Sequence, residues 1–132
     1  MVRRTARAAA IYERWYTKDI DFFLLASDSN AEKMKKVLDD FGFSSLGITT
    51  EELKQTGQII QLGVEPHRIN LINQIKGVEF ENAWKKKVII TIDGLDVKLI
   101  SIEDLIQNKL ATARPQDLAD AELLKKINQP AI

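Results

Sequence analysis

Two patterns take turns along this chain. In some stretches apolar and polar residues alternate, and in others apolar residues recur every three or four positions. These patterns predict a mixture of strands and helices. The most apolar stretch is DIDFFLLA, at 19–26. Successive side chains of a strand point to opposite faces, so both faces of this stretch are apolar beyond Asp21. Such a strand is typical of the middle of a sheet that is covered on both sides.

The remaining elements are predicted from periodicity and from capping and turn residues. Helices are expected over residues 2–15, from an N-cap at Asn30 to Gly42, over 77–87, over 102–114 and from Pro115, with a short capped helix or turn at 49–57. Ser101 and Asp104 form an imperfect capping box at the start of the helix over 102–114, because Asp stands where Glu or Gln is preferred. Strands are expected over 58–64 and 67–73, and a hairpin over 88–100 with Asp93 and Gly94 at its turn. This order predicts an α/β fold of the α+β type, a twisted mixed sheet with helices packed mainly on one face.

Composition narrows the class of protein. The 132 residues hold 19 basic and 19 acidic side chains, and a zero net charge gives no general reason to expect nucleic acid as a partner. Cysteine is absent, which excludes disulfides, thiolate metal sites and a cysteine nucleophile. No apolar run is long enough to span a membrane, and the first residues lack the apolar core of a secretory signal. We therefore expect one domain over residues 1–132, located in the cytoplasm and without a membrane partner.

Asp19 and Asp21 raise the main chemical question, because they stand side by side on one face of the most apolar strand. Two close carboxylates repel each other unless a cation or several hydrogen-bond donors lie between them. One interpretation is a solvated strand end, where Lys18 screens both charges. The other is a Mg²⁺ site, because carboxylate oxygens suit this ion and bring it together with substrate phosphates.

Three segments taken in order resemble a known family. They are TKDIDFFL, GQIIQLGVEPHRINLI and the run from GVEFENAW to ARPQDLAD, which together extend from about Thr17 to Leu124. They are similar to the small bacterial nucleotidyltransferase-like proteins of the DNA polymerase beta-type superfamily, including the toxin–antitoxin type. The resemblance implies a nucleotidyltransferase-like fold in which Asp19 and Asp21 bind Mg²⁺ beneath a nucleoside triphosphate. A third residue on a later strand completes the site, so catalytic roles are implied for Asp19, Asp21 and Asn70.

The chain departs from the family pattern at two places. Asn70 stands where the family has aspartate, and an amide offers an oxygen but no charge and no proton acceptor. The family also has a glycine-rich turn before its first strand, whereas the first glycine here is Gly42. Either the Arg-rich segment replaces that turn, or this chain starts downstream of it. Residues 1–16 are therefore interpreted as a divergent N-terminal segment.

Two basic residues are candidates for binding the nucleotide. Arg68 shares a strand face with Asn70, whereas His67 points away. Arg68 could steady a triphosphate or neutralise the paired aspartates. Lys109 lies in an apolar stripe of its helix, where its ammonium either snorkels to the helix edge or points into the cleft to meet a phosphate or Asp117.

The motif ARPQDLAD is interpreted as structural. Asp117 and Asp120 fall in the first turns of the last helix, where the helix dipole favours anions without any ligand. Together with Arg114, they are expected to hold the last two helices in register.

Three hypotheses on function remain open. The first is a Mg²⁺-dependent enzyme that transfers a nucleotidyl group from a nucleoside triphosphate to a hydroxyl of RNA, protein or a small molecule. The second is a non-catalytic nucleotidyltransferase fold that binds or regulates a protein partner, for instance in a toxin–antitoxin pair. The third is a likeness of fold alone, with the two aspartates as a surface pair.

Overall fold

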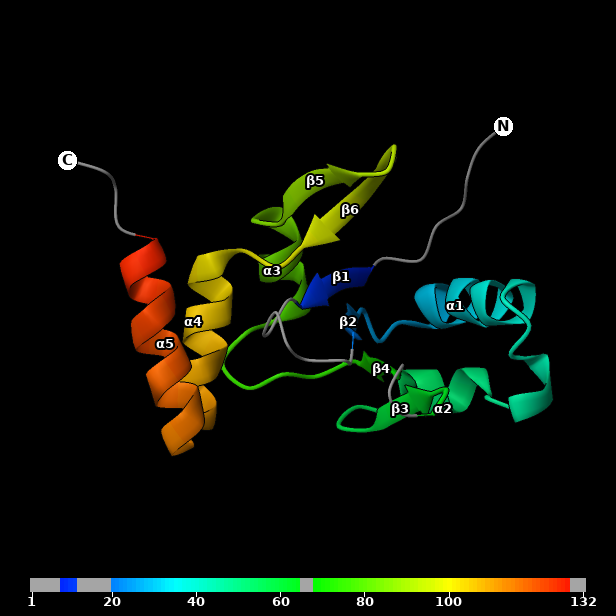
Figure 1. The fold of residues 1–132 in the computed structure, drawn as a ribbon. Coiled ribbons are helices and arrows are strands. Elements are labelled where there is room, and N and C mark those ends of the chain that lie inside the picture. The colour runs from blue at the N-terminus through cyan, green and yellow to red at the C-terminus, as the bar shows by residue number, and fades with distance from the viewer. Residues whose placement is uncertain (1–7, 12–19, 65–67, 129–132) are drawn as a thin grey trace.

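A computed structural model describes residues 8–11, 20–64 and 68–128 of the chain, and the side chains of 8–11 are not among the described parts. A six-stranded mixed sheet with the order β3-β4-β2-β1-β6-β5 forms its centre (Figure 1). The strands are β1 (Ala8–Ile11), β2 (Ile20–Leu24), β3 (Ile59–Leu62), β4 (Ile69–Ile72), β5 (Val88–Ile92) and β6 (Leu95–Leu99). The helices are α1 (Asp28–Asp40), α2 (Thr50–Lys54), α3 (Phe80–Lys85), α4 (Ile102–Thr112) and α5 (Pro115–Ile127), with a 3-10 turn at Ser44–Leu46.

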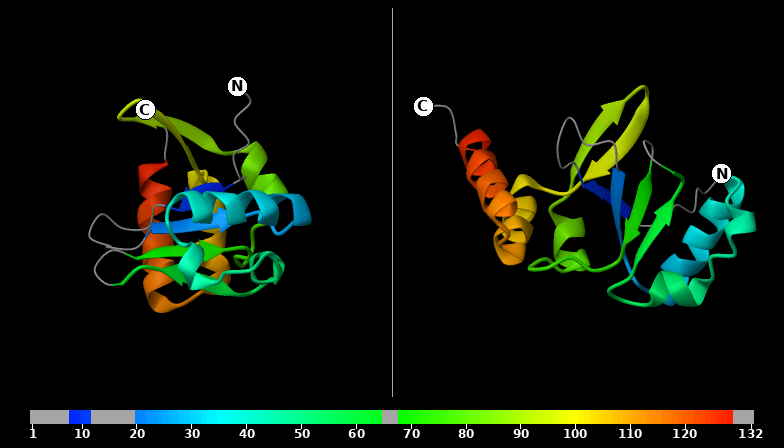
Figure 2. Two further views of the ribbon diagram at one scale, coloured as in Figure 1. Left: turned by 90° about the vertical axis from the view of Figure 1, so that its right-hand side faces the viewer. Right: turned by 60° about the horizontal axis from the view of Figure 1, so that its bottom comes forward.

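The helices divide between the two faces of the sheet: α1 and α2 lie on one side, and α3, α4 and α5 on the other. Figure 1 and the right-hand view of Figure 2 show the sheet between these two groups. Phe22 and Leu24 of β2 pack toward α1 and α2, whereas Phe23 packs toward α3 and α4. The first core contains Leu24, Ala31, Met34, Leu38, Ile48, Leu53, Leu62 and Leu71; the second contains Phe23, Phe80, Ala83, Ile100 and Leu105. The expected α+β fold with a mixed sheet is confirmed. The distribution of helices differs from the expectation of one covered face, because β2 is apolar on both sides and requires cover on both.

The helix expected over residues 2–15 is wrong for its central part, because Ala8–Ile11 forms strand β1. This strand pairs antiparallel with β2, with Ala10 opposite Phe22, and its other edge meets β6 through the parallel pair Ala10 and Leu99. Alanine favours a helix by only a fraction of a kilocalorie per residue, so pairing with two strands outweighs the local preference. The rest of the divergent segment lies outside the described residues.

Helix α1 begins three residues before the expected position. Its N-cap is Ser27, whose side chain accepts a hydrogen bond from the Asn30 N–H at 3.1 Å. Asn30, which was expected to be the cap, is buried inside the first turn, and its Nδ2 donates to the Leu25 carbonyl at 2.9 Å. Asn30 thereby fixes the helix to the end of β2. The helix runs to Asp40, and Gly42 follows its C-cap as the expected stop residue, with a φ of +87° that is left-handed backbone and that glycine tolerates well.

The capping and turn signals of the sequence are confirmed in four other places. The predicted hairpin is β5–β6, and positive φ angles at Asp93 and Gly94 identify its two-residue turn as type I′. Ser101 caps α4 by accepting from the Asp104 N–H, and Pro115 opens α5. In α2, the Thr49 side chain and Glu52 form a reciprocal capping box.

Candidate functional site

Asp21 and Asn70 meet on neighbouring parallel strands. β2 and β4 pair in a register that sets Asp21 opposite Asn70, and the Asn70 Nδ2 donates a hydrogen bond to the Asp21 Oδ1 at 2.8 Å. By strand alternation both side chains share the sheet face of Phe23, which faces α3 and α4. The neighbouring Ile20 is half exposed, whereas Phe23 and Leu24 are buried, so the polar pair lies at the open end of β2. The structure brings two of the three predicted catalytic residues together.

The Asn70 amide is satisfied on one side only. Its Oδ1 is buried and accepts no hydrogen bond from any described residue. Turning the amide over would place this oxygen beside the Asp21 carboxylate, and two such oxygens repel each other unless a cation lies between them. Carboxylate and amide oxygens are both ligands of hard divalent cations. The residues present therefore fit Mg²⁺, with one negative charge fewer than a pair of aspartates would supply.

Of the other predicted site residues near this pair, the structure describes Arg68, whereas Asp19 lies outside the described residues. Arg68 directly precedes β4, its side chain is half-buried, and its carbonyl accepts from the Ile20 N–H at 3.1 Å, which places Arg68 beside the start of β2. In the part of the chain that the structure describes, no three His, Cys, Asp or Glu side chains gather to hold a metal ion. A site with three carboxylates would thus require residues outside that part.

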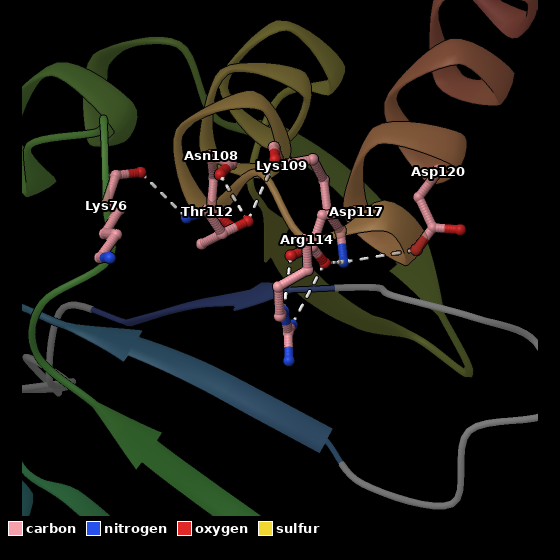
Figure 3. A network of polar contacts seen from close by, with 7 residues as sticks. All are labelled: Lys76, Asn108, Lys109, Thr112, Arg114, Asp117 and Asp120. Carbon is pink, nitrogen blue, oxygen red and sulfur yellow. Dashed lines mark hydrogen bonds and ion pairs between the residues drawn. The ribbon is translucent and has the colours of Figure 1, made fainter.

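Lys109 is enclosed in a charged network between α4 and α5 (Figure 3). Its side chain is 6% exposed, so the expectation that it snorkels to the helix edge is wrong. The Lys109 ammonium lies 3.8 Å from the Asp117 Oδ1 and 3.6 Å from the Asp120 Oδ2. Arg114 completes the network with hydrogen bonds of 2.7 and 3.2 Å to the two carboxylate oxygens of Asp117. These contacts agree with the structural role expected for ARPQDLAD, because they join the two helices.

Residues 5–131 match the family described as "Nucleotidyl transferase of unknown function (DUF2204)". The chain belongs to this family. The resemblance found from the sequence is thereby confirmed at the level of a nucleotidyltransferase-like family, whereas the toxin–antitoxin type and the bacterial origin stay predictions. No curated protein and no solved structure matches the chain. None of the helices within the described ranges combines the length and the apolar character that crossing a membrane requires.

The carboxyl of Asp117 has a strongly lowered pKa in this family member. Hydrogen bonds from Arg114 lower the pKa of Asp117 from 3.8 to about 2, and the Thr112 hydroxyl and the charge of Lys109 add to this effect, while burial opposes it. A carboxyl whose pKa is lower in the folded than in the unfolded state stabilises the fold while it is ionised. This stabilisation is complete above the unfolded pKa and is lost as the pH falls through the folded pKa.

We expect the free energy of unfolding to fall as the pH is lowered from about 4 to about 2, because Asp117 then becomes protonated and loses its charged partners. Urea denaturation at a series of pH values measures this decline. In the Asp117→Asn variant the decline should be shallower, since the amide does not titrate. Equal slopes for the variant and the wild type in this range would contradict the assignment.

The network contains one contributor that sequence reasoning missed. Thr112 follows Lys109 by three residues and so lies on the same side of α4, which was the available signal. Its hydroxyl oxygen lies 3.1 Å from the Lys109 carbonyl oxygen, and a hydrogen bond from this hydroxyl to the Asp117 carboxylate contributes to the low pKa of Asp117. Asn108 was also missed; its Nδ2 donates to the Lys76 carbonyl at 2.9 Å and ties α4 to the segment after β4.

A second buried carboxylate lies at the other end of α4. Asp104 was expected only as a partial capping residue, but it is 5% exposed and accepts a hydrogen bond from the Lys86 ammonium at 2.8 Å. This ion pair joins the end of α3 to the start of α4. No sequence signal links Lys86 with Asp104, because the two residues are adjacent only after the hairpin has folded between them.

A cavity of about 340 Å³ lies on the opposite face of the sheet from Asp21 and Asn70. Its walls are apolar and are formed by Phe22, Leu24, Met34, Val37, Leu38, Phe41, Phe43, Leu62, Ile69 and Leu71. Walls of this kind offer neither cations nor donors to a triphosphate. The cavity is therefore not a candidate for the nucleotide site.

Proposed function

We propose that this chain transfers a nucleotidyl group from a nucleoside triphosphate to a hydroxyl acceptor with the help of Mg²⁺. The observation that carries the proposal is the contact between Asp21 and Asn70, which faces α3 and α4 at the open end of two parallel strands. It stands at the place where the nucleotidyl transferase family is expected to hold its metal. The acceptor is a hydroxyl of RNA, protein or a small molecule.

Three oxygen-bearing side chains would hold the ion: the carboxylates of Asp19 and Asp21 and the amide oxygen of Asn70. When bound, Mg²⁺ would neutralise charge that develops on the phosphoryl oxygens. The chain itself supplies Asp21 as a proton acceptor for the hydroxyl, because the Asn70 amide cannot take up a proton. The loss of one carboxylate at position 70 is expected to make both metal binding and turnover weak.

Arg68 is the better suited of the two basic candidates for the triphosphate. It lies beside Ile20, directly before β4, and alternation assigns it to the face of Asn70. A guanidinium offers a planar set of donors that matches phosphate oxygens. Lys109 is less suited, because its ammonium already lies within 4 Å of two carboxylates. We assign Lys109 to the support of the helix pair beside the site.

A thermal-shift experiment tests the proposal. ATP, GTP, CTP and UTP, each with Mg²⁺, are added to the wild type, to Asp21→Asn and to Asp96→Asn, a matched control at an exposed carboxylate of the hairpin. At least one nucleotide should raise the melting temperature of the wild type and of the control but not that of Asp21→Asn. If no nucleotide at millimolar concentration stabilises the wild type, the proposed function is wrong.

The geometry also favours a second candidate function, a non-catalytic nucleotidyltransferase fold that regulates a protein partner, as in a toxin–antitoxin pair. The supporting observation is that Asn70 donates its N–H to Asp21, so one of the metal-facing oxygens is already occupied without any ion. This candidate predicts that the wild type binds Mg²⁺ poorly whereas an aspartate at position 70 restores binding. Tight binding of Mg²⁺ by the wild type would exclude it.

A further inference from the structure

Strand β5 is an edge strand of unusual composition. It lies at the end of the sheet and pairs with β6 on one side only, among the strands that the structure describes. Its sequence VIITI contains neither a charge nor a proline, the features by which proteins usually protect an exposed edge. All five of its residues are exposed, with Val88 at 47%, Ile89 at 55% and Ile92 at 50%. An apolar edge of this kind is a template for another strand.

We propose that β5 pairs with β5 of a second copy of this chain, antiparallel and about a two-fold axis at Ile90. In this register Val88 lies opposite Ile92 of the second copy, and Ile89 lies opposite Thr91. The sheets of the two copies then join into one sheet across the interface. The register follows from three properties of the strand: its backbone phase, its charges and its apolar face.

The backbone phase comes from the hairpin turn. In a hairpin with a two-residue turn at Asp93 and Gly94, the flanking pair Ile92 and Leu95 is hydrogen-bonded, and the pattern then alternates along the strands. The N–H and C=O groups of Ile90 therefore point to β6, and those of Ile89 and Thr91 point to the open edge. A two-fold axis at Ile90 sets Ile89 opposite Thr91 of the second copy. Each such pair can exchange two hydrogen bonds, so the register satisfies the edge groups of both copies.

The charges at the two ends of β5 are complementary in the same register. A run of three lysines, 85–87, precedes the strand, and Asp93 follows it. An axis at Ile90 places Lys87 opposite Asp93 of the second copy, and the symmetry repeats this pair. The Lys87 ammonium donates a hydrogen bond to the Trp84 carbonyl at 3.1 Å and lies 4.2 Å from the centroid of the Trp84 ring. An ammonium has three N–H donors, so a further one remains to meet a carboxylate. Shifting the register by two residues would lose both pairs.

The apolar face of the hairpin also continues across the interface. The cross-strand pairs Val88–Leu99, Ile90–Val97 and Ile92–Leu95 share one face, on which Leu95 is 67% exposed. In the register with the axis at Ile90, Val88, Ile90 and Ile92 of one copy lie opposite Ile92, Ile90 and Val88 of the other, so the apolar side chains of both copies share one face of the joined sheet. The paired hairpins then form a four-stranded apolar surface in which the β5 side chains of one copy pack against those of the other. β3, the other edge of the described sheet, is shorter and carries Gln61.

Complementary charge variants test the proposal. Light scattering coupled to size exclusion should give twice the mass of one chain for the wild type in the micromolar range. Lys87→Glu alone and Asp93→Lys alone each create two like-charge pairs, so each should weaken association by at least about tenfold. In an equimolar mixture of the two variants, both interfacial pairs are again of opposite charge. The mixture should therefore associate more tightly than either variant does by itself.

Ile90→Lys serves as a second variant, because it places two ammonium groups at the axis without changing the turn. It should be monomeric while its circular dichroism and melting temperature show a folded chain. A wild type that stays monomeric across the micromolar range overturns the proposal. A dimer that resists Ile90→Lys, or a mixture of charge variants that fails to associate, overturns it as well. None of these outcomes depends on nucleotide or Mg²⁺.

Discussion

Replacing Asp117 with alanine is expected to lower the free energy of unfolding by about 3–5 kcal/mol, the usual effect of breaking a buried ion pair. The Asp117 side chain is 1% exposed and accepts two hydrogen bonds from Arg114. Its removal takes away one of the two carboxylates, Asp117 and Asp120, that lie within 4 Å of the buried Lys109 ammonium, and so reduces the compensation of a positive charge inside the protein. Asp117→Ala should therefore destabilise the packing of α4 against α5 much more than a substitution at an exposed residue would.

Urea denaturation at neutral pH measures this effect, and Glu122→Ala is the matched control. Glu122 lies on the same helix and pairs with Lys125 at 3.1 Å, but both side chains are largely exposed. Exposed pairs contribute no more than about 1 kcal/mol, so the control should change little. If Asp117→Ala fails to fold, Asp117→Asn offers a milder version. Similar losses for Asp117→Ala and Glu122→Ala would show that the buried network does not stabilise the helix pair.

Asn70→Asp is expected to increase the affinity for Mg²⁺ by at least about tenfold over the wild type. The substitution sets a second carboxylate beside Asp21, where the amide now donates a hydrogen bond of 2.8 Å. Without a cation the two carboxylates repel each other, so the variant should melt at a lower temperature than the wild type. Addition of Mg²⁺ should then stabilise the variant strongly and the wild type weakly.

Isothermal titration calorimetry and melting curves over a series of MgCl₂ concentrations measure both effects. Asn70→Ala is the control that separates charge from geometry, because it removes the hydrogen bond to Asp21 without adding a carboxylate. The alanine variant should bind no more Mg²⁺ than the wild type. If Asn70→Asp and Asn70→Ala respond to Mg²⁺ alike, position 70 does not face the ion.

Elements fixed by neighbours in the sequence were predicted well. The β5–β6 turn at Asp93 and Gly94 and the cap at Ser101 depend on residues no more than three positions apart, so their signals are complete within a short window. Ala8–Ile11 was wrongly assigned to a helix. Its strand conformation is decided by pairing with β2 and β6, and its partner in β6, Leu99, lies far along the chain. A propensity summed over a window contains no term for such pairing.

The candidate site shows the same division. The alternation of β2 and the family resemblance placed Asp21 and Asn70 on the same site, and the structure brings them into contact. The direction of the contact, with the amide as donor, depends on a rotamer that no sequence pattern specifies. The sequence left open whether Lys109 snorkels or turns inward to meet Asp117, because the choice depends on how α5 packs against α4; the structure shows the inward position, with Asp120 as a further neighbour.

The position of β1 between β2 and β6 has a consequence for the order of events during translation. β2 can pair with β1 soon after both have left the ribosome, but β6 ends at Leu99, so the other edge of β1 has no strand to meet until most of the chain has been made. Contacts between such distant segments form late and slow the completion of a fold. A nascent chain therefore carries an incomplete sheet through most of its synthesis, with a risk of wrong pairing that ends only when the second half of the sheet arrives.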